Sequence, residues 1–314
     1  MVRDYCKRAS LQVSYKAKAK INLFLKVLDK LPNNYHDLQS LVAFAEVYDY
    51  LEFSYSDINI MESSGRFANL LPKDNSNLIF KVLSYFQEFF LIKQNVKIYL
   101  TKNLPIGGGI GGGSSDCAMT ILALNKLFKL NLTFTDLLKI AIKFGADVPM
   151  CLYQIHQQQA LFIQGVGEKI QPFNLIRKFP ILLITPLQPV STGLCFNKFD
   201  ELKNKILNSD KFNSTMPTSF IEPIKYSDIP YNEDLFLDFI NLQSNDLTAS
   251  ACFFVPVIKE ILDQLAATKP LVHKMSGSGS TCFAIYNNLD QAQQAFLALK
   301  KIFPGFYKVV SQLN

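Results

Sequence analysis

Residues 16–28 alternate between apolar and polar side chains, which is the pattern of a β-strand. One face of this segment holds Ala17, Ala19, Ile21, Leu23, Leu25 and Val27. The other face holds Lys16, Lys18, Lys20, Asn22 and Lys26, joined by Phe24. A helix would spread the apolar residues around its circumference, so the strand is favoured. The pattern predicts one buried face and one exposed row of lysines, and residues 40–60 are expected to form further strands.

Two of the helices expected in the first half of the chain have candidate capping residues. Apolar side chains recur at helical spacing over residues 78–90, and the preceding Asn77 is of a type that caps helix N-termini. Thr135 is expected to cap a second helix, which ends at Gly145 because glycine favours helix termination.

The second half of the chain mixes both periodicities. Residues 150–185 are mostly β-like and contain a turn at residues 165–167. Residues 203–234 are rich in Asn, Ser, Pro and Lys, which predicts an irregular excursion. Helices are expected at about 256–267 and 290–301.

The order of these elements predicts an α+β fold with two domains, because strands and helices mix without a regular βαβ repeat. The composition of the sequence changes past Val190, and the domain boundary is placed near residue 170. We therefore expect an N-terminal domain over residues 1–170 and a C-terminal domain over residues 171–314.

Composition excludes several classes of protein. The 314 residues are 49% hydrophobic with a net charge of +6, which excludes long disorder. The six cysteines are dispersed without a CxxC pair, so neither a zinc motif nor a disulfide scaffold is expected. No secretory signal or membrane-length apolar stretch is visible, and a cytoplasmic location is expected. The mild positive charge suits nucleic acid or an anionic small substrate.

The strongest local signal is a cluster of six glycines within residues 107–113, in the segment LPIGGGIGGGSSD. It lies between a predicted strand at residues 96–101 and a helix predicted to start near Ser114. Bare backbone N–H groups beside a helix N-terminus can bind an anion, which favours a phosphate cradle over a flexible linker. The candidate ATP-binding residues are Pro105, Ile106, Gly107, Gly108, Gly109, Ile110, Gly111, Gly112, Gly113, Ser114 and Ser115.

Other phosphate-binding motifs fit this segment poorly. A Walker A loop requires Gly-Lys-Ser/Thr, which does not follow here. A dinucleotide-binding unit requires a strand after the helix, whereas another helix is expected. The protein-kinase motifs HRD and DFG do not occur.

Four segments together resemble the GHMP family of small-molecule kinases. The glycine-rich segment is similar to the second motif of that family. Residues 19–23 (AKINL) with Tyr35-His36 resemble the N-terminal motif, residues 145–149 (GADVP) the aspartate motif, and residues 275–279 (MSGSG) the third motif. The resemblance implies the two-domain GHMP kinase fold, with an S5-like ATP-binding domain followed by an α/β sandwich domain.

The resemblance also implies an activity and residue roles. It implies transfer of phosphate from ATP, with Mg²⁺, to a hydroxyl group of a small cytidyl diphosphate substrate. Lys20 and Asp147 are the implied catalytic residues, with Asp147 as the general base. Asn22, Tyr35, His36 and Phe196 are the implied substrate-binding residues, with Tyr35 stacking on the cytosine and Phe196 facing it. No dense cage of carboxylates is visible, so the metal is expected to arrive with ATP.

Two other positions are left with more than one interpretation, and a third is given one. Lys102 either reaches ATP or is a lysine of a surface loop. Asp116 stands where the family usually has Asn, and it points away from the phosphates, caps the helix or faces Mg²⁺. Asn245, with Asp246 after it, is interpreted as a helix cap.

Two alternative functions compete with this interpretation. One is a GHMP kinase for homoserine or a mevalonate derivative, against which the double triple-glycine and Tyr35-His36 argue. The other is a non-catalytic RNA-binding module that uses the lysines of residues 16–26, which leaves the glycine cluster unexplained. Neither a nucleic-acid nor a membrane partner is expected, and the protein is expected to be a monomer or a weak homodimer.

Overall fold

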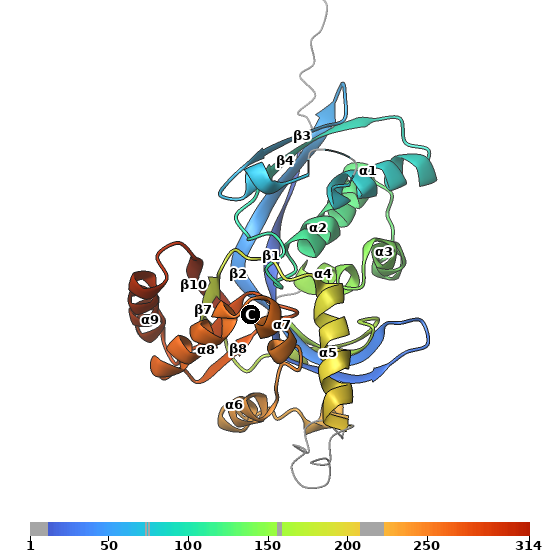
Figure 1. The fold of residues 1–314 in the computed structure, drawn as a ribbon. Helices are drawn as coiled ribbons and strands as arrows, with labels where there is room; N and C mark the ends of the chain where they lie inside the picture. The colour runs from blue at the N-terminus through green and yellow to red at the C-terminus, as the bar shows by residue number, and fades with distance from the viewer. Residues whose placement is uncertain (1–11, 73, 75, 156–158, 208–222) are drawn as a thin grey trace, which may run out of the picture. The chain divides into compact units, whose positions relative to one another are not determined.

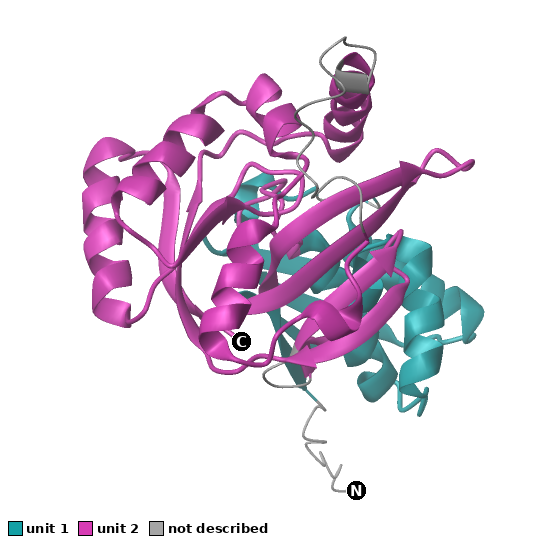
Figure 2. Cartoon of the chain, turned by 90° about the horizontal axis from the view of Figure 1, so that it is seen from below, with its two compact units in different colours: residues 1–17, 48–104, 113–152 teal, residues 18–47, 105–112, 153–314 magenta. Residues whose placement is uncertain are grey.

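The computed structural model describes residues 12–72, 74, 76–155, 159–207 and 223–314, and it divides into two compact units. Unit 1 comprises residues 1–17, 48–104 and 113–152, and unit 2 comprises residues 18–47, 105–112 and 153–314 (Figure 2). Both units are discontinuous in sequence, so no single cut in the chain separates them. The predicted boundary near residue 170 stays a prediction.

Unit 1 is a sheet with helices on one of its faces (Figure 1). It contains parts of β1 (Val13–Lys30) and β2 (His36–Ser56), together with β3 (Ile60–Ser64) and β4 (Asn95–Thr101). β2 pairs with β4 in antiparallel fashion, and β3 pairs with β4 in parallel fashion. The helices are α1 (Leu78–Phe89), α2 (Gly112–Leu127), α3 (Phe134–Ala141) and α4 (Val148–Leu152).

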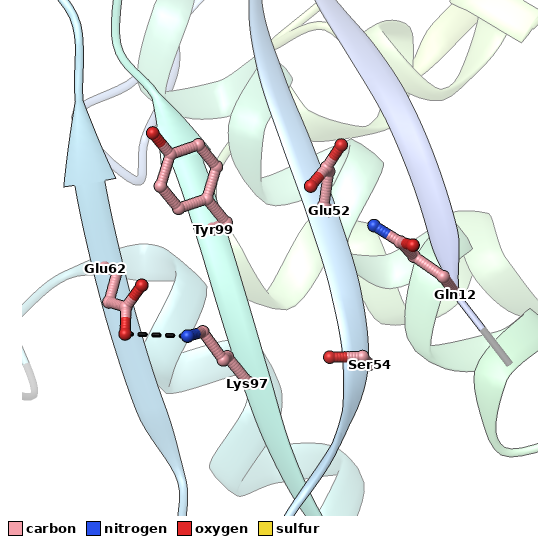
Figure 3. A pocket seen from close by; sticks show the side chains of 6 residues that line it. All are labelled: Gln12, Glu52, Ser54, Glu62, Lys97 and Tyr99. Atoms are coloured by element: carbon pink, nitrogen blue, oxygen red, sulfur yellow. Dashed lines mark hydrogen bonds and ion pairs between the residues drawn. The ribbon is translucent and has the colours of Figure 1, made fainter. Parts of the chain in front are cut away.

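The other face of this sheet carries polar side chains. They line a hollow of about 300 Å³ whose residues are Gln12, Glu52, Ser54, Glu62, Lys97 and Tyr99 (Figure 3). Lys97 and Glu62 form an exposed ion pair there, with 2.7 Å between Nζ and Oε1. Alternation along β4 explains the arrangement, because Val96, Ile98 and Leu100 are buried between these polar positions.

Unit 2 is built around the fully buried strand β7 (Phe179–Thr185). β7 pairs with β9 (Cys282–Ile285) on one side and with β10 (Tyr307–Leu313) on the other, and β8 (Val272–Met275) pairs with β9. β5 (Gln159–Gly165) pairs in antiparallel fashion with β2 on one side and with β6 (Lys169–Asn174) on the other. The helices are α5 (Thr192–Leu207), α6 (Glu233–Leu242), α7 (Thr248–Phe254), α8 (Val257–Ala267) and α9 (Leu289–Ile302).

Short 3₁₀ helices complete the described chain, at Ala68–Leu70, Ile142–Phe144, Tyr153–Ile155 and Tyr226–Asp228. No helix among the residues that the structure describes is long and apolar enough to cross a membrane.

The α+β class and several predicted elements are confirmed. The alternating segment 16–28 lies in β1, and the predicted helices correspond to α1, α2, α8 and α9. Asn77 caps α1 as predicted, because its side-chain oxygen accepts a hydrogen bond from the backbone N–H of Ile79 at 3.0 Å.

Other expectations require correction. Thr133, and not Thr135, caps α3: its hydroxyl accepts from the N–H of Asp136, whose carboxylate accepts from the N–H of Thr133. Residues 148–155 are helical instead of β-like. The predicted irregular stretch 203–234 overlaps the end of α5 and the start of α6, and its residues 208–222 lie outside the described chain.

β1 also differs from its predicted burial. Lys20 and Lys26 are only 5% and 4% exposed, so the expected exposed row of lysines is wrong at these two positions. The alternation predicts a single buried face, but β1 has neighbours on both faces along this stretch. One of these neighbours is the glycine-rich segment, which contacts Lys20 as described below.

Candidate active site

The glycine-rich loop of unit 2, residues 105–112, takes a conformation that requires glycine. Gly107, Gly109 and Gly111 have φ angles of +69°, +75° and +65°, which L side chains rarely adopt. A Cβ on Gly109 would lie 2.6 Å from the carbonyl oxygens of both Ser276 and Gly279. The glycines are therefore needed for a close backbone-to-backbone contact, which a flexible linker would not require.

The partner in this contact is the loop between β8 and β9, residues 276–281, which we call the hairpin loop. The backbone N–H of Thr281 donates to Gly108 O at 3.0 Å, and Ser276 Oγ donates to Gly109 O at 3.3 Å. Gly277 has φ +58°, and a Cβ there would lie 2.7 Å from Gly109 O. The hairpin loop therefore meets the glycine-rich loop in a close backbone-to-backbone contact.

Lys20 and Asn22 of β1 lie beside the glycine-rich loop and the hairpin loop. The backbone N–H of Lys20 donates to Ile110 O at 2.8 Å, and a Cβ on Gly111 would lie 3.1 Å from the Cβ of Lys20. The backbone N–H of Asn22 donates to Ser276 Oγ at 3.1 Å. The structure thus brings the predicted lysine and amide together with the glycine-rich loop.

Asn22 carries a buried acceptor that can receive a ligand. Its Nδ2 donates to Ser40 Oγ at 2.8 Å, but its Oδ1 has no hydrogen-bond partner among the described residues. This oxygen lies 3.5 Å from the space that a Cβ on Gly277 would fill. Because an unpaired buried acceptor costs about 1–3 kcal/mol, a donor from a bound molecule would stabilise this arrangement.

The remaining predicted residues of the phosphate site belong to unit 1. α2 begins at Gly112, two residues before the predicted start, so Gly113, Ser114 and Ser115 form its first turn. Ser115 is buried, and its Oγ lies 3.5 Å from the sulfur of Cys151 in α4. Asp147 is half-buried in the turn before α4. The predicted general base, Asp147, therefore belongs to unit 1, and the predicted catalytic lysine, Lys20, belongs to unit 2.

Lys102 is buried in an ion cluster of unit 1. It is 2% exposed, which contradicts its interpretation as a surface lysine. Its Nζ lies 2.6 Å from Asp49 Oδ2 and 2.5 Å from Asp116 Oδ2. Asp49 Oδ1 accepts hydrogen bonds from the backbone N–H groups of Asn103 and Leu104, which lead into the glycine-rich loop. Asp116, in α2, is thus an ion-pair partner of Lys102.

The electrostatics of this cluster are unbalanced, since two carboxylates face one ammonium. Burial lowers the pKa of Lys102, but the charges of Asp116 and Asp49 outweigh it and raise that pKa overall. Burial raises the pKa of Asp116 to about 7, the charge of Lys102 opposes this, and the charge of Asp49 adds to it. Asp116 Oδ1 has no hydrogen-bond partner among the described residues, so its ionised form is poorly solvated.

The raised pKa of Asp116 predicts a pH-dependent stability that Asp116→Asn removes. Below pH 4 the carboxyl is protonated in both the folded and the unfolded chain. As pH rises from about 4 to about 7 the unfolded chain loses this proton while the folded chain keeps it. The free energy of unfolding therefore falls over this window, by on the order of 4 kcal/mol at most. Urea unfolding of both proteins at several pH values measures the difference, and parallel curves would contradict the assignment.

The predicted base-binding residues of unit 2 lie around the start of β2. Tyr35 follows a turn in which Asn34 has φ +65°, and it is 60% exposed. His36 Nε2 lies 2.8 Å from Asp200 Oδ1, and the His36 ring stacks on Phe196 with 4.7 Å between centroids. A cavity of about 260 Å³ beside them is lined by Val27, Asp29, Lys30, His36, Phe199, Asp200, Lys203 and Asn204.

Sequence reasoning missed three residues that organise these sites. Asp49 is one of several acidic residues of β2, with Glu46 and Glu52 three positions away on either side, so its residue type alone does not mark it as buried. Asp200 is a helix residue whose partner His36 is 164 positions away, so no local pattern reveals the pair. Asn245 was interpreted as a helix cap, but its side chain donates to the backbone on both sides of Ser276, at Met275 O and Gly277 O.

The comparisons with known proteins establish the class. Residues 77–154 match the model of the GHMP kinases N terminal domain, and residues 236–305 match that of the GHMP kinases C terminal domain. The chain belongs to the GHMP kinase family, and this membership implies ATP as the phosphate donor.

Relatives that match nearly the full chain share the name of one particular kinase within this family. The chain is 36% identical over 296 residues to a 4-diphosphocytidyl-2-C-methyl-D-erythritol kinase of Rhizobium etli (strain CIAT 652), covering 94% of this chain and 93% of the relative. It is 33% identical to the kinase of the same name from Brucella melitensis biotype 1, covering 94% and 93%. A crystal structure of 4-(cytidine 5'-diphospho)-2C-methyl-D-erythritol kinase is similar with a TM-score of 0.76 at 26% identity, covering 96% and 99%.

Proposed function

We propose that this protein transfers the γ-phosphate of ATP to the 2-hydroxyl of 4-diphosphocytidyl-2-C-methyl-D-erythritol, a step of non-mevalonate isoprenoid synthesis. The observation that carries the proposal is the contact between the glycine-rich loop and the hairpin loop beside Lys20 and Asn22. It leaves a stretch of backbone without side chains next to a buried ammonium and a buried amide. Relatives that match nearly the full chain carry the name of this kinase.

The glycine-rich loop and the start of α2 bind the phosphates of ATP in this proposal. The backbone of residues 105–115 offers N–H groups, and the first turn of α2 adds the positive end of a helix dipole. Lys102 has an indirect role in this proposal. Its ion pairs with Asp116 and Asp49 fix the end of the segment that leads from β4 into the loop. This placement favours a supporting role for Lys102 over the predicted contact with ATP.

Lys20 and Asp147 carry the chemistry. The Asp147 carboxylate accepts the proton of the substrate 2-hydroxyl as that oxygen forms its bond to the γ-phosphorus. The bond between the γ-phosphorus and the bridging oxygen breaks, and ADP leaves with that oxygen. The Lys20 ammonium offsets negative charge on the transferred group. Asn22 Oδ1 accepts a hydrogen bond from a substrate hydroxyl.

The residues present fit a magnesium ion that arrives with ATP. No cluster of three or more His, Cys, Asp or Glu side chains suited to a metal occurs in the described parts of the chain. The hydroxyls of Ser114 and Ser115 are the oxygen donors at the start of α2, and they contact the phosphates or the ion in this proposal. When bound, the ion neutralises charge on the β- and γ-phosphates.

The cytosine binds beside His36 in this proposal. Tyr35 offers an exposed ring for stacking, which is worth about 1–3 kcal/mol per base. Phe196 faces the base from α5, and the hydrogen bond of His36 Nε2 to Asp200 orients the imidazole whose other nitrogen reads the base edge. The expectations of a cytoplasmic monomer or weak homodimer without a nucleic-acid partner remain predictions.

A panel of alcohols tests the proposal. ADP release is measured with ATP and, in turn, the cytidyl alcohol, homoserine and mevalonate. We expect kcat/KM for the cytidyl alcohol to exceed that for either competitor by at least about 100-fold, because only this substrate presents a base for stacking and a hydrogen bond to His36. A preference for homoserine or mevalonate would assign the chain to another branch of the family.

A further inference from the structure

The segment Ser244–Asp246 forms a short parallel bridge to β1 in unit 2. The backbone N–H of Leu25 donates to Ser244 O at 3.1 Å, and the N–H of Asp246 donates to Leu25 O at 2.9 Å. Asp246 Oδ2 accepts from the backbone N–H of Val27 at 2.9 Å. This segment is therefore fixed to the strand that carries Lys20 and Asn22.

Asn245, at the centre of this bridge, holds the hairpin loop. Its Nδ2 donates to Met275 O and to Gly277 O, at 2.8 Å in both cases, and its Oδ1 accepts from the N–H of Leu247 at 3.0 Å. The Asn245 side chain is buried, so these three hydrogen bonds are shielded from water. The two acceptors flank Ser276.

Ser276, which lies between the two carbonyl groups held by Asn245, connects the hairpin loop to the glycine-rich loop. Its Oγ accepts from the N–H of Asn22 and donates to Gly109 O. Gly277, whose carbonyl Asn245 holds, is the residue whose Cβ would touch Gly109 O. A change in the position of Ser276 or Gly277 must therefore move Gly109, because the two loops are packed too closely to admit even one additional carbon atom.

We propose that Asn245 is a positioning residue that couples β1 to the glycine-rich loop and keeps that loop in its phosphate-binding conformation. The inference rests on the proposed binding of ATP phosphates by that loop. Asn245 itself touches neither substrate, and it acts through the hairpin loop. Its removal should therefore weaken binding of ATP more than binding of the alcohol substrate.

Asn245→Asp is the sharpest test, because it keeps the shape of the side chain and replaces two N–H donors by an oxygen facing two carbonyl oxygens. We expect KM for ATP to rise about tenfold or more and kcat to fall, with a smaller change in KM for the cytidyl alcohol. Calorimetric titration with ATP alone should show the same weakening. Asn245→Ala deletes the donors without adding charge and should give a smaller shift in the same direction.

Asn241→Asp is the matched control. The exposed Asn241 amide donates to Leu271 O at 2.8 Å, just before the other end of β8, and this variant should keep wild-type kinetics. Wild-type KM and affinity for ATP in a folded Asn245→Asp or Asn245→Ala protein would overturn the inference, even if the melting temperature fell. Failure of the wild-type protein to bind ATP in the titration would instead overturn the proposed function.

Discussion

We expect the Asp147→Asn protein to fold normally and to turn over about 10²- to 10⁴-fold more slowly than the wild type, which is the range that general-base catalysis contributes. The amide keeps the size of the carboxylate but cannot take the proton of the attacking hydroxyl. Asp147 is only half-buried in its turn, so the neutral replacement leaves little buried polar surface unsatisfied. Steady-state ADP release gives kcat, and thermal melting checks the fold.

Asp57→Asn serves as the control for this variant, because it makes the same change at an exposed position of the same unit. It should retain wild-type kcat. Turnover of Asp147→Asn within a few-fold of the wild type would remove Asp147 from the mechanism and leave Lys20 and the loops to act by positioning and charge alone.

Lys102→Met should lose about 3–5 kcal/mol of unfolding free energy, the usual consequence of removing one partner from a buried ion cluster. The methionine fills similar space, but Asp49 and Asp116 are left facing each other without a cation. Urea unfolding measures the loss at neutral pH. The loss should shrink when Asp116→Asn is added, because that second change removes one of the two uncompensated carboxylates.

Lys97→Met is the matched control for this prediction. Lys97 also forms an ion pair in unit 1, with Glu62, but the pair lies on the open face of the sheet (Figure 3). Exposed pairs contribute about 0–1 kcal/mol, so this variant should be nearly as stable as the wild type. Equal losses for the two variants would show that the Lys102 cluster is solvated and does not hold the loop.

Local patterns predicted the elements whose cause is local. The alternation of residues 16–28, the cap at Asn77 and the conformational demand of six clustered glycines each depend on residues close in sequence. Thr133 was missed in favour of Thr135 because both threonines precede the same apolar repeat. Only the spacing to Asp136, three residues after Thr133, distinguishes them.

The features that hold the site together were beyond local reasoning. Lys102 reaches Asp49 across 53 positions, and Asn245 reaches Gly277 across 32. Pairings at this separation depend on strand order and on which loops meet. The alternation of residues 16–28 alone therefore places Lys20 in an exposed row, whereas the structure buries it against the glycine-rich loop.

Phosphorus NMR of the product of ATP and the cytidyl alcohol identifies which oxygen receives the phosphate. We expect a new phosphomonoester resonance to appear as the γ-phosphate signal of ATP declines, with the monoester on the 2-oxygen and the cytidyl diphosphate intact. Release of inorganic phosphate alone, or a monoester at another oxygen, would contradict the proposed function.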